Sequence, residues 1–580
     1  METVWKMPNV DSGMVQTIIN RYNVHPVVAR VLVSRGLTDD KLLYQFFCGE
    51  FKDISSPFII KNMKAAADLV AEAVKSGKKI VVFGDYDVDG TTATVIMLHL
   101  LKAMNANVDF FIPNRLSDGY GLSVESASHV METLKPDLVV SVDCGITSFE
   151  AVTYFRRRDV TVVITDHHLP VGGRLPEADV LVNPKLEEGS ASEFLCGAAV
   201  AFKLGWAVAQ IISNSNRVLP HLRKAIVDII PLVALATVAD VMPLIGENRL
   251  IVTRGLKMLS ESAKLSPGLR ALLQALQLDN GLVHSSDIGF KIAPRINAAG
   301  RIADAKMVVD LLRAESDYDA QSLVKELDEL NSYRRQLCEQ VEQEVDFLIA
   351  QEEGLETLPA IIVYGKDWHK GVIGVVAARA TERYNRSVII FTNDYEDVLC
   401  GSGRAVNGMD IKSILDQCSE LLVRYGGHKG AAGMGVTISN LPQFKKRFYE
   451  IAVQKSCEQK VTKVIQVDAE VEHDFLDMSL ATAIESLEPF GEGNRKPLLL
   501  AKGLSIVDAR TVGHDNRHLK VRFVTEYGTM VDSVGFGLGE RIEDLDNSIT
   551  HDVIFFPSIN EWRGRRTIDL QIEDFKVHYH

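Results

Sequence analysis

Short apolar runs alternate with longer amphipathic stretches between about residues 65 and 245. Five of these runs are four or five residues long and rich in Val, Ile, Leu or Phe: 79–83, 108–112, 138–142, 161–165 and 179–182. Buried strands that alternate with helices form a parallel sheet with helices on both faces. The pattern therefore predicts a doubly wound α/β domain over residues 51–312, whose part after residue 246 is mostly helical.

The rest of the chain divides into four further parts. Residues 1–50 predict a small helical lead-in. A charged stretch without Gly or Pro, residues 317–353, predicts one long helix with a single apolar stripe: Leu323, Leu327, Leu330, Leu337, Val341, Val345 and Leu348. We interpret it as a connecting helix between lobes (residues 313–356), although a coiled coil with a partner has the same pattern. A second α/β domain follows over residues 357–459, and short strand-like runs with Gly-rich turns predict a β-barrel over residues 460–580.

Composition indicates a soluble globular protein of several domains. The chain has 580 residues, of which 46% are hydrophobic and 24% charged. Its longest apolar stretch, residues 229–245, is interrupted by Pro231, Asp240 and Pro243, which favours a buried core element over a membrane span. The N-terminus lacks the basic-then-apolar pattern of a secretion signal, and seven cysteines without a CxxC pair favour a reducing compartment. We therefore expect a cytoplasmic protein with no membrane partner.

Net charge restricts how the chain could bind nucleic acid. Sixty-three Lys and Arg against 77 Asp and Glu give a formal charge of −14. Phosphate contacts come from Lys and Arg, so a nucleic-acid-binding surface on this chain must be local.

Three carboxylates follow the first predicted strand at every second position. Asp85, Asp87 and Asp89 stand in the segment GDYDVDG. Alternate residues of an extended segment point the same way, so the three side chains can converge, and like charges at close range need a cation among them. Mg²⁺ and Mn²⁺ are the hard ions that carboxylates bind. The alternative is an Asp/Gly-rich turn whose side chains cap the next helix.

Probable metal ligands also follow three other apolar elements. Asp143 follows the run 138–142, and Asp166, His167 and His168 follow the run 161–165. Asp240 ends the apolar stretch that begins at residue 229. Open parallel sheets place their sites at the carboxyl ends of the strands, so we expect these residues to meet in one crevice.

Basic residues in small-residue segments are candidates for binding phosphate. Small residues let the backbone approach an anion, and Arg can donate two hydrogen bonds to phosphate, although ordinary turns have the same composition. There are three such segments: NAAG, which two arginines flank; GSGR; and GGHKG. A further segment, PNR, supplies a fourth arginine. The candidates are Arg295, Arg301, Ser402, Arg404, Gly427, His428 and Arg115.

The predicted barrel has its own candidate for single-strand binding. Aromatic and basic residues alternate in WRGRR, which contains Trp562 and Arg565. Bases stack on aromatic rings while cations follow the phosphates. A solvated hairpin with one surface Trp is the alternative.

The motifs together resemble a known family. GDYDVDG, SVDCGI, TDHH and ATVADVMPL resemble the motifs of the DHH phosphoesterase superfamily, and GGHKGAAG resembles its DHHA1 domain. With APRINAAGR, DWHKGVIGVVAAR and NEWRGRRTIDLQI, they resemble the RecJ family of single-stranded-DNA-specific exonucleases, from about residue 78 to the C-terminus. The resemblance implies degradation from the 5′ end, an OB-fold as the C-terminal barrel, and a role in DNA repair and recombination. A single-strand-binding protein and a helicase are the expected partners of a monomer.

Hydrolysis of a phosphodiester by this family is expected to use two divalent ions, Mn²⁺ or Mg²⁺. The proposed ligands are Asp87, Asp89, Asp143, His167 and Asp240, and their mixture of imidazole and carboxylate favours Mn²⁺. Asp85 is expected to bind metal or to orient the ligands, and Asp166, beside His167, is expected to orient them. By the resemblance, His168 donates a hydrogen bond or a proton to the phosphate, although it could instead support His167.

Two other functions fit parts of the pattern. One is a DHH phosphodiesterase of short oligonucleotides, cyclic dinucleotides or polyphosphate, which usually needs only two domains. The other is a RecJ-like replication scaffold that has lost its metal ligands. The predicted barrel disfavours the first, and the complete set of Asp and His residues disfavours the second.

Overall fold

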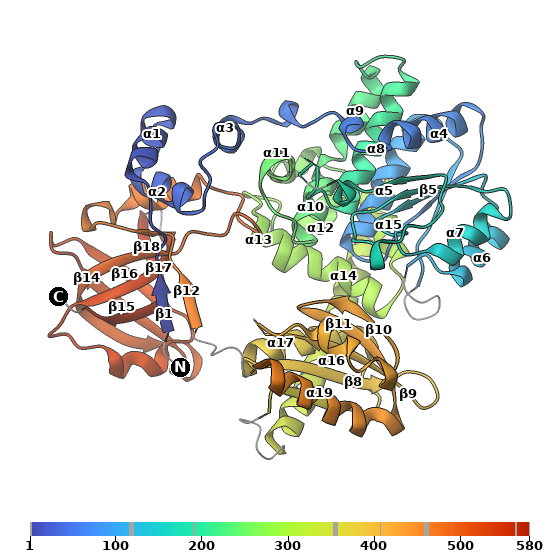
Figure 1. The fold of residues 1–580 in the computed structure, drawn as a ribbon. Coiled ribbons are helices and arrows are strands. Elements are labelled where there is room, and N and C mark those ends of the chain that lie inside the picture. The colour runs from blue at the N-terminus through green and yellow to red at the C-terminus, as the bar shows by residue number, and fades with distance from the viewer. Residues whose placement is uncertain are drawn as a thin grey trace. The chain divides into compact units, whose positions relative to one another are not determined.

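The computed structural model describes two compact units of the chain (Figure 1). Unit 1 comprises Met1–Pro113, Asp118–Ala293 and Lys463–His580, and unit 2 comprises Asn114–Ser117 and Pro294–Thr462. The described residues are 3–114, 121–187, 189–190, 192–351, 358–406, 408–456, 463–562 and 565–578. No helix among them is both long and apolar enough to cross a membrane.

A five-stranded parallel sheet forms the centre of the first domain of unit 1. Its order is β3-β2-β4-β5-β6, with bounds Val108–Phe111, Ile80–Phe83, Leu138–Val142, Thr161–Thr165 and Val180–Val182. Two helices cover one face, α6 (Val124–Thr133) and α7 (Phe149–Arg156). The other face carries α4 (Met63–Lys75), α5 (Val88–Ala103) and α8 (Gly197–Ile212). Helices on both faces confirm the doubly wound fold, and the strand runs were predicted to within one residue.

A group of helices follows this sheet, as the sequence predicts. Their bounds are α9 (Pro220–Asp228), α10 (Ile230–Ala239), α11 (Gly246–Leu259), α12 (Pro267–Ala275), α13 (Ser285–Asp287), α14 (Ala293–Ile302) and α15 (Lys306–Leu312). A π-helical turn, Ile288–Ile292, precedes α14. The apolar stretch that ends at Asp240 is therefore a buried helix, α10, and not a strand.

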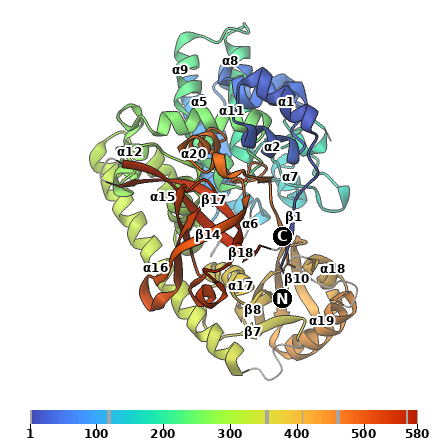
Figure 2. The same ribbon diagram turned by 90° about the vertical axis from the view of Figure 1, so that its left-hand side faces the viewer.

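The C-terminal strands of unit 1 form a closed barrel. Their order is β13-β14-β15-β16-β18-β17, and β14 also pairs with β17. The bounds are Ala469–Glu470, Leu499–Val512, His518–Val524, Met530–Gly535, His551–Trp562 for β17 and Arg565–Val577 for β18. Figure 2 shows β14, β17 and β18 with helix α20 (Met478–Glu485). This closure is what an OB-fold requires.

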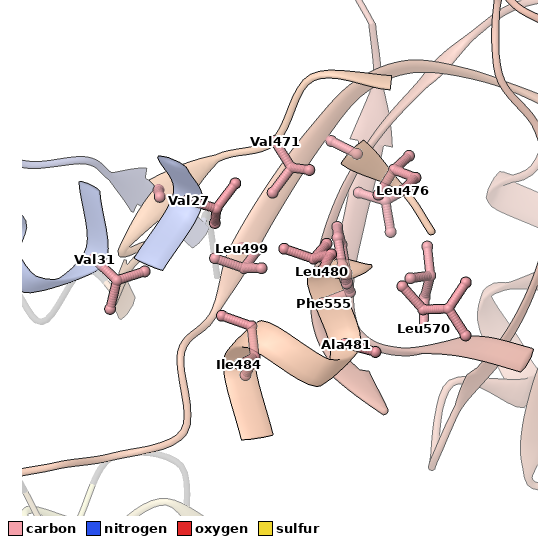
Figure 3. Close-up of a cluster of buried hydrophobic side chains, with 14 of the residues drawn as sticks. Val27, Val31, Val471, Leu476, Leu480, Ala481, Ile484, Leu499, Phe555 and Leu570 are labelled. Carbon is pink, nitrogen blue, oxygen red and sulfur yellow. The ribbon is translucent and has the colours of Figure 1, made fainter. Parts of the chain in front are cut away.

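The N-terminal helices share the core of this barrel. They are α1 (Ser12–Tyr22), α2 (Pro26–Ser34) and α3 (Asp40–Cys48). Val27 and Val31 of α2 pack in one cluster with Leu480 of α20 and Phe555 of β17 (Figure 3). In addition, β1 (Thr3–Lys6) pairs in parallel with β12 (Lys463–Gln466). The two ends of the chain thus build one domain.

Unit 2 contains the long helix and a second sheet. Helix α16 spans Asp317–Gln351 (Figure 2), close to the prediction. The sheet has the order β10-β11-β9-β8-β7, and helices α17 (Lys370–Tyr384), α18 (Ile411–Asp416) and α19 (Leu441–Ser456) pack on it. The strands are β7 (Ala360–Tyr364), β8 (Ser387–Asn393), β9 (Val398–Arg404), β10 (Leu422–His428) and β11 (Ala431–Thr437).

Three expected loops are regular structure instead. GSGR lies at the end of β9, GGH lies in the edge strand β10, and the segment with Arg295 and Arg301 is helix α14. The predicted stripe of α16 is also only partly right. Leu327, Val341 and Val345 are buried, but the same face buries polar residues that the apolar pattern excludes.

Candidate metal centre and phosphate-binding residues

The predicted carboxylates and histidines meet at the carboxyl edge of the parallel sheet. Asp85 follows β2 by two residues, and Asp143 follows β4 directly. Asp166, His167 and His168 follow β5, and Asp240 is the C-cap of α10. The prediction that these distant residues converge is therefore supported by the fold.

The three alternating aspartates do not lie on one extended segment. Asp87 is the N-cap of α5, and its Oδ1 accepts a hydrogen bond from Gly90 N at 3.0 Å. Asp89 lies in the first turn of that helix. Because Asp89 is helical, alternation along an extended segment was the wrong reason for convergence. The capping alternative is correct for Asp87, which remains available to the site.

The ligand atoms form overlapping groups that could hold a metal ion. Within each group one atom per residue lies within 4.8 Å of the others. The groups are Asp85, Asp87 and Asp143; Asp89, His167 and Asp240; and Asp143, His167 and His168. Asp143 and His167 each belong to two groups, so the groups form one continuous cluster.

His167 is the centre of the cluster. Its Nε2 lies 3.2 Å from Asp143 Oδ1, 3.6 Å from Asp240 Oδ2 and 3.7 Å from Asp89 Oδ2. Buried atoms without a hydrogen-bond partner among the described residues include Asp143 Oδ1 and Asp240 Oδ2. Buried carboxylate oxygens are rarely left unpaired, so a cation would fit as the missing partner of each atom.

The acidic side chains are held near one another at a high electrostatic cost. Burial, together with neighbouring carboxylates, raises the pKa of Asp85 to about 7, of Asp89 to about 6 and of Asp240 to about 8. The same two causes raise the pKa of Asp143 well above its usual range. A divalent cation among these groups would favour their ionised forms again.

The two adjacent histidines differ in charge: His167 is neutral and His168 is positive. Burial, followed by the charge of His168, lowers the pKa of His167 to about 3, so its imidazole is neutral, as a metal ligand must be. Burial opposes the charged form of His168, but the Asp166 hydrogen bond and carboxylate charges raise its pKa to about 9. His168 is thus a half-exposed cation beside a neutral ligand.

Asp166 holds the loop that carries both histidines and contacts the His168 ring directly. Its Oδ1 accepts hydrogen bonds from the backbone N–H groups of His167 at 2.7 Å and His168 at 3.0 Å, and lies 2.8 Å from His168 Nδ1. Its Oδ2 accepts from Ile146 N at 2.9 Å. Burial opposes ionisation, but the His168 hydrogen bond and charge outweigh it and lower the pKa of Asp166. Asn183, which the sequence did not suggest, donates to the His168 carbonyl at 2.8 Å.

Strained backbone accompanies two of the ligand positions. Asp143 has φ 60°, and Val241, directly after Asp240, has φ 55°. A β-branched residue at positive φ is a genuine outlier, and such strain persists where the surrounding structure fixes it, often at functional sites.

Three predicted phosphate-binding residues lie together in unit 2. Arg404 Nη1 donates to Ser402 Oγ at 3.2 Å, and Arg301 Nη1 donates to Gly371 O at 3.4 Å, at the start of α17. A side chain at Gly374, one turn later, would meet Ser402 Oγ at 2.9 Å and Arg404 Nη2 at 3.2 Å. Burial and the charge of Arg301 lower the pKa of Arg404. Two arginines therefore face the first turns of one helix.

Arg334 of α16 joins this cluster and was missed by the sequence. It is only 8% exposed, its Nε has no partner among the described residues, and Nη2 donates to Asn331 Oδ1 at 3.2 Å. Burial and the charges of nearby arginines, including Arg301, lower its pKa. Within the described part of the chain no acidic side chain lies within ion-pair distance of Arg334 or Arg404. Both arginines are therefore candidates for binding an anion.

The remaining candidates are placed differently. Arg295 is ion-paired with Asp328 of α16, with Nε and Oδ1 2.6 Å apart. Gly427 and His428 are exposed on β10, and Gly427 has φ 138° beside the Ala431 carbonyl. Arg115 lies outside the described residues. Trp562 and Arg565 are paired at the ends of β17 and β18, with side chains outside the description.

Comparison with known proteins agrees with the fold. Residues 79–237 match the DHH family N-terminal domain, and residues 357–454 match the DHHA1 domain. The parallel sheet with its Asp and His cluster thus defines a DHH phosphoesterase. Residues 467–574 match the RecJ OB domain.

Relatives that match nearly the whole of this chain identify the family more narrowly. The chain is 33% identical over 576 residues to the single-stranded-DNA-specific exonuclease RecJ of Bacillus subtilis (strain 168), covering 99% of this chain and 71% of that one. RecJ of Thermus thermophilus in complex with Mn²⁺ superposes with a TM-score of 0.84 at 30% identity, covering 99% of this chain and 80% of that one. Its Mg²⁺ complex gives 0.77 at 28% identity, with 99% and 78% covered. The chain belongs to the RecJ family of single-stranded-DNA-specific exonucleases.

Proposed function

We propose that this chain is a metal-dependent exonuclease that degrades single-stranded DNA from the 5′ end, in DNA repair and recombination. The observation that carries the proposal is the buried Asp and His cluster with its unpartnered carboxylate oxygens, in a chain of RecJ type. The relatives are named as single-stranded-DNA-specific exonucleases, and the structurally similar RecJ was solved with Mn²⁺ and with Mg²⁺.

Two divalent ions, Mn²⁺ or Mg²⁺, would be held by the residues that form the overlapping groups. Asp87, Asp89, Asp143, His167 and Asp240 are the proposed ligands, and Asp85 lies close enough to join them or to orient Asp87. When bound, such ions supply a water nucleophile near neutral pH and neutralise charge on the phosphate. The neutral imidazole of His167 favours Mn²⁺, since Mg²⁺ prefers oxygen ligands.

His168 is the proposed donor to the phosphate or to the leaving oxygen. It is half-exposed, and Asp166 holds its ring through Nδ1, which leaves Nε2 to meet substrate. Asp166 also accepts hydrogen bonds from the backbone N–H groups of Ile146, His167 and His168, and so fixes the loop that carries both histidines. A fixed, protonated imidazole is the arrangement that general acid catalysis needs.

The arginine cluster of unit 2 is the proposed binding site for the phosphate at the 5′ end. A terminal phosphate adds an anion that an internal phosphate lacks, and Arg301, Arg334, Ser402 and Arg404 offer it donors beside the start of α17. Arg guanidinium groups bind phosphate by two hydrogen bonds. Arg295 already has an acid partner, which makes it the weaker candidate, and Arg115 stays a candidate from sequence alone.

The barrel is proposed to hold the rest of the strand. Trp562 and Arg565 at the tip of the β17–β18 hairpin would stack a base and contact a phosphate. We further propose a cytoplasmic monomer that works with a single-strand-binding protein and a helicase, as expected for a nuclease that needs an unwound strand.

Hydrolysis by purified protein with Mn²⁺ or Mg²⁺ tests the proposal. The substrates are end-labelled single-stranded DNA, duplex DNA and a dinucleotide, and we expect rapid release of nucleotides only from the 5′ end of the single strand. Asp143→Asn or Asp240→Asn should lower the rate by several orders of magnitude, because each removes a carboxylate that faces His167. Glu150→Gln, an exposed acid on α7, is the control and should leave the rate unchanged.

Each alternative predicts a different result. Preference for the dinucleotide would favour a small-substrate DHH phosphodiesterase. Strand binding by wild-type protein without hydrolysis in either metal would favour a scaffold. Full activity of Asp143→Asn, or activity in excess EDTA, would overturn the metal-dependent mechanism.

A further inference from the structure

One short segment contacts two of the proposed metal ligands and the helix that carries a third. Cys196, Gly197 and Ala198 form the N-cap and first residues of α8. The side chain of the N-cap makes no capping hydrogen bond there, so the first N–H groups of α8 need another acceptor.

Asp89 is that acceptor. Gly197 N donates to Asp89 Oδ2 at 2.6 Å, and Ala198 N donates to Asp89 Oδ1 at 2.7 Å. Both carboxylate oxygens are thereby fixed by the start of a helix that is 16 residues long. Each oxygen keeps a second lone pair for a metal ion. The helix terminus sets the orientation of Asp89 and favours its ionised form.

Gly197 also sets the position of Asp143. A Cβ at Gly197 would lie 2.4 Å from Asp143 Cβ and 2.5 Å from its Oδ1. The base of a short side chain cannot move away without its backbone, and Asp143 already has a strained φ of 60°. Only glycine at this position therefore lets the start of α8 donate hydrogen bonds to Asp89 without displacing Asp143.

Cys196 connects the same segment to the third ligand. Its Sγ lies 3.6 Å from Thr237 Oγ1, and its backbone leads directly into Gly197, whose N–H donates to Asp89. Thr237 lies on α10, three residues before Asp240, and its hydroxyl donates to Val233 O at 2.7 Å. A displacement of Cys196 would thus reach both Asp89 and the helix that carries Asp240.

We infer that the segment Cys196–Ala198 is the positioning element of the metal centre, with Gly197 as the residue that sets the spacing of Asp89 and Asp143. This inference rests on the proposed function, because it assumes that those carboxylates bind metal. Partners outside the ligand set that orient the ligands typically contribute 10- to 100-fold to metal affinity.

Gly197→Ala tests the inference, with Gly205→Ala as a matched control. Both glycines lie on α8, two turns apart, and a Cβ at Gly205 would meet Leu100 Cδ1, the far end of a flexible side chain. We expect Gly197→Ala to weaken Mn²⁺ binding by roughly 10- to 100-fold, measured by titration calorimetry or Mn²⁺ electron paramagnetic resonance on the full chain. Gly205→Ala should bind Mn²⁺ as wild type does, and excess Mn²⁺ should restore activity to Gly197→Ala.

The outcomes separate this inference from the proposed function. Wild-type affinity in Gly197→Ala overturns the inference and leaves the metal-dependent nuclease standing. Absence of Mn²⁺ binding by wild-type protein overturns both. If Gly197→Ala does not fold, Cys196→Ala takes its place, with Cys196→Ser as the conservative variant that keeps a donor. Weaker Mn²⁺ binding by Cys196→Ala than by Cys196→Ser supports the inference, and equal, wild-type binding by both overturns it.

Discussion

At the scale of single residues, this enzyme buries like charges together at two places. Asp85, Asp89 and Asp143 are buried beside one another in unit 1, and Arg334 is buried beside other arginines in unit 2. Removing a charge from water without an opposite partner costs several kcal/mol, so each cluster is destabilising by itself. The proposed ligands, divalent cations at the acidic cluster and a phosphate at the arginines, would each supply the missing opposite charge.

The arginine cluster gives a prediction about substrate ends. Arg404→Ala should lower kcat/KM on a 5′-phosphorylated strand by roughly 10- to 150-fold, which corresponds to the about 1.5–3 kcal/mol of a charged hydrogen bond. A 5′-hydroxyl strand lacks the extra anion and should lose much less. Rates of wild type and mutant on both strands, measured side by side, check this expectation.

Arg424→Ala is the control for the arginine prediction. Arg424 lies on β10 of the same sheet, is exposed, and is ion-paired with Asp394. Its removal should leave the ratio between the two strands unchanged. Equal losses on both strands in Arg404→Ala would show that Arg404 does not read the end.

At the scale of elements, one hydrophobic core stabilises both the N-terminal helices and the barrel. Helix α2 and helix α20 pack into one core with strands β14, β17 and β18 (Figure 3). Arg35, the C-cap of α2, adds an ion pair to buried Asp468, with Nε and Oδ1 2.9 Å apart. Trp5 of β1 donates to Asp574 of β18 at 2.8 Å. Deleting either chain end would therefore expose the core of the other.

Leu480→Ala should destabilise this shared core. Leu480 is fully buried between the helices and the barrel, and a buried Leu→Ala change typically costs about 2–5 kcal/mol. We expect a lower midpoint in urea unfolding followed by tryptophan fluorescence, to which Trp5 contributes. Hydrolysis of a short single-stranded oligonucleotide at low temperature should persist, because the proposed metal ligands lie outside the core that contains Leu480.

Leu282→Ala is the matched substitution for Leu480→Ala, because Leu282 is 77% exposed. Its unfolding midpoint should equal that of wild type. An unchanged midpoint in Leu480→Ala would mean that the helices and the barrel do not share a core in solution.

The elements also show what the sequence could predict. Buried strands such as 138–142 were found because a short, continuous β-branched run is typical of a buried strand, and the ligands after them followed from sheet geometry. β9 and β10 were missed because Gly has a low strand propensity, and pairing with β11 overrides it. Arg334 was missed because a polar residue on the buried face of a helix interrupts the apolar stripe. Gly197 was missed because its role depends on a contact with Asp143, far away in sequence.

At the scale of the whole molecule, the metal centre links stability to pH. The folded pKa values of Asp85, Asp89 and Asp240, about 7, 6 and 8, exceed the ordinary value of 3.8 because of burial and neighbouring carboxylates. Between about pH 4 and pH 8 the folded protein binds more protons at these groups than the unfolded chain does. Their contribution to the stability of the metal-free protein is therefore present at low pH and is lost as pH rises through this window.

Mn²⁺ should reverse that loss, because it replaces the protons. We expect the increase in melting temperature on adding Mn²⁺, relative to EDTA, to be larger at pH 8 than at pH 6. Scanning calorimetry at both pH values measures it. In Asp143→Asn the difference between the two pH values should shrink, and an equal Mn²⁺ effect in wild type at pH 6 and pH 8 would contradict the linkage.

The parallel pairing of β1 with β12 has a consequence for how the chain is made. Helices α1–α3 end at Cys48, while β12 begins at Lys463. A ribosome adds roughly 5–20 residues per second. The helices are therefore synthesised roughly 20–80 s before β12, the strand that pairs with β1. During that interval the apolar face of the helices has no barrel to pack against. The parallel sheet and unit 2 are synthesised in the same interval. The DHH domain can thus fold before the OB-fold is synthesised, and the first helices of the chain are among the last elements to reach their native core.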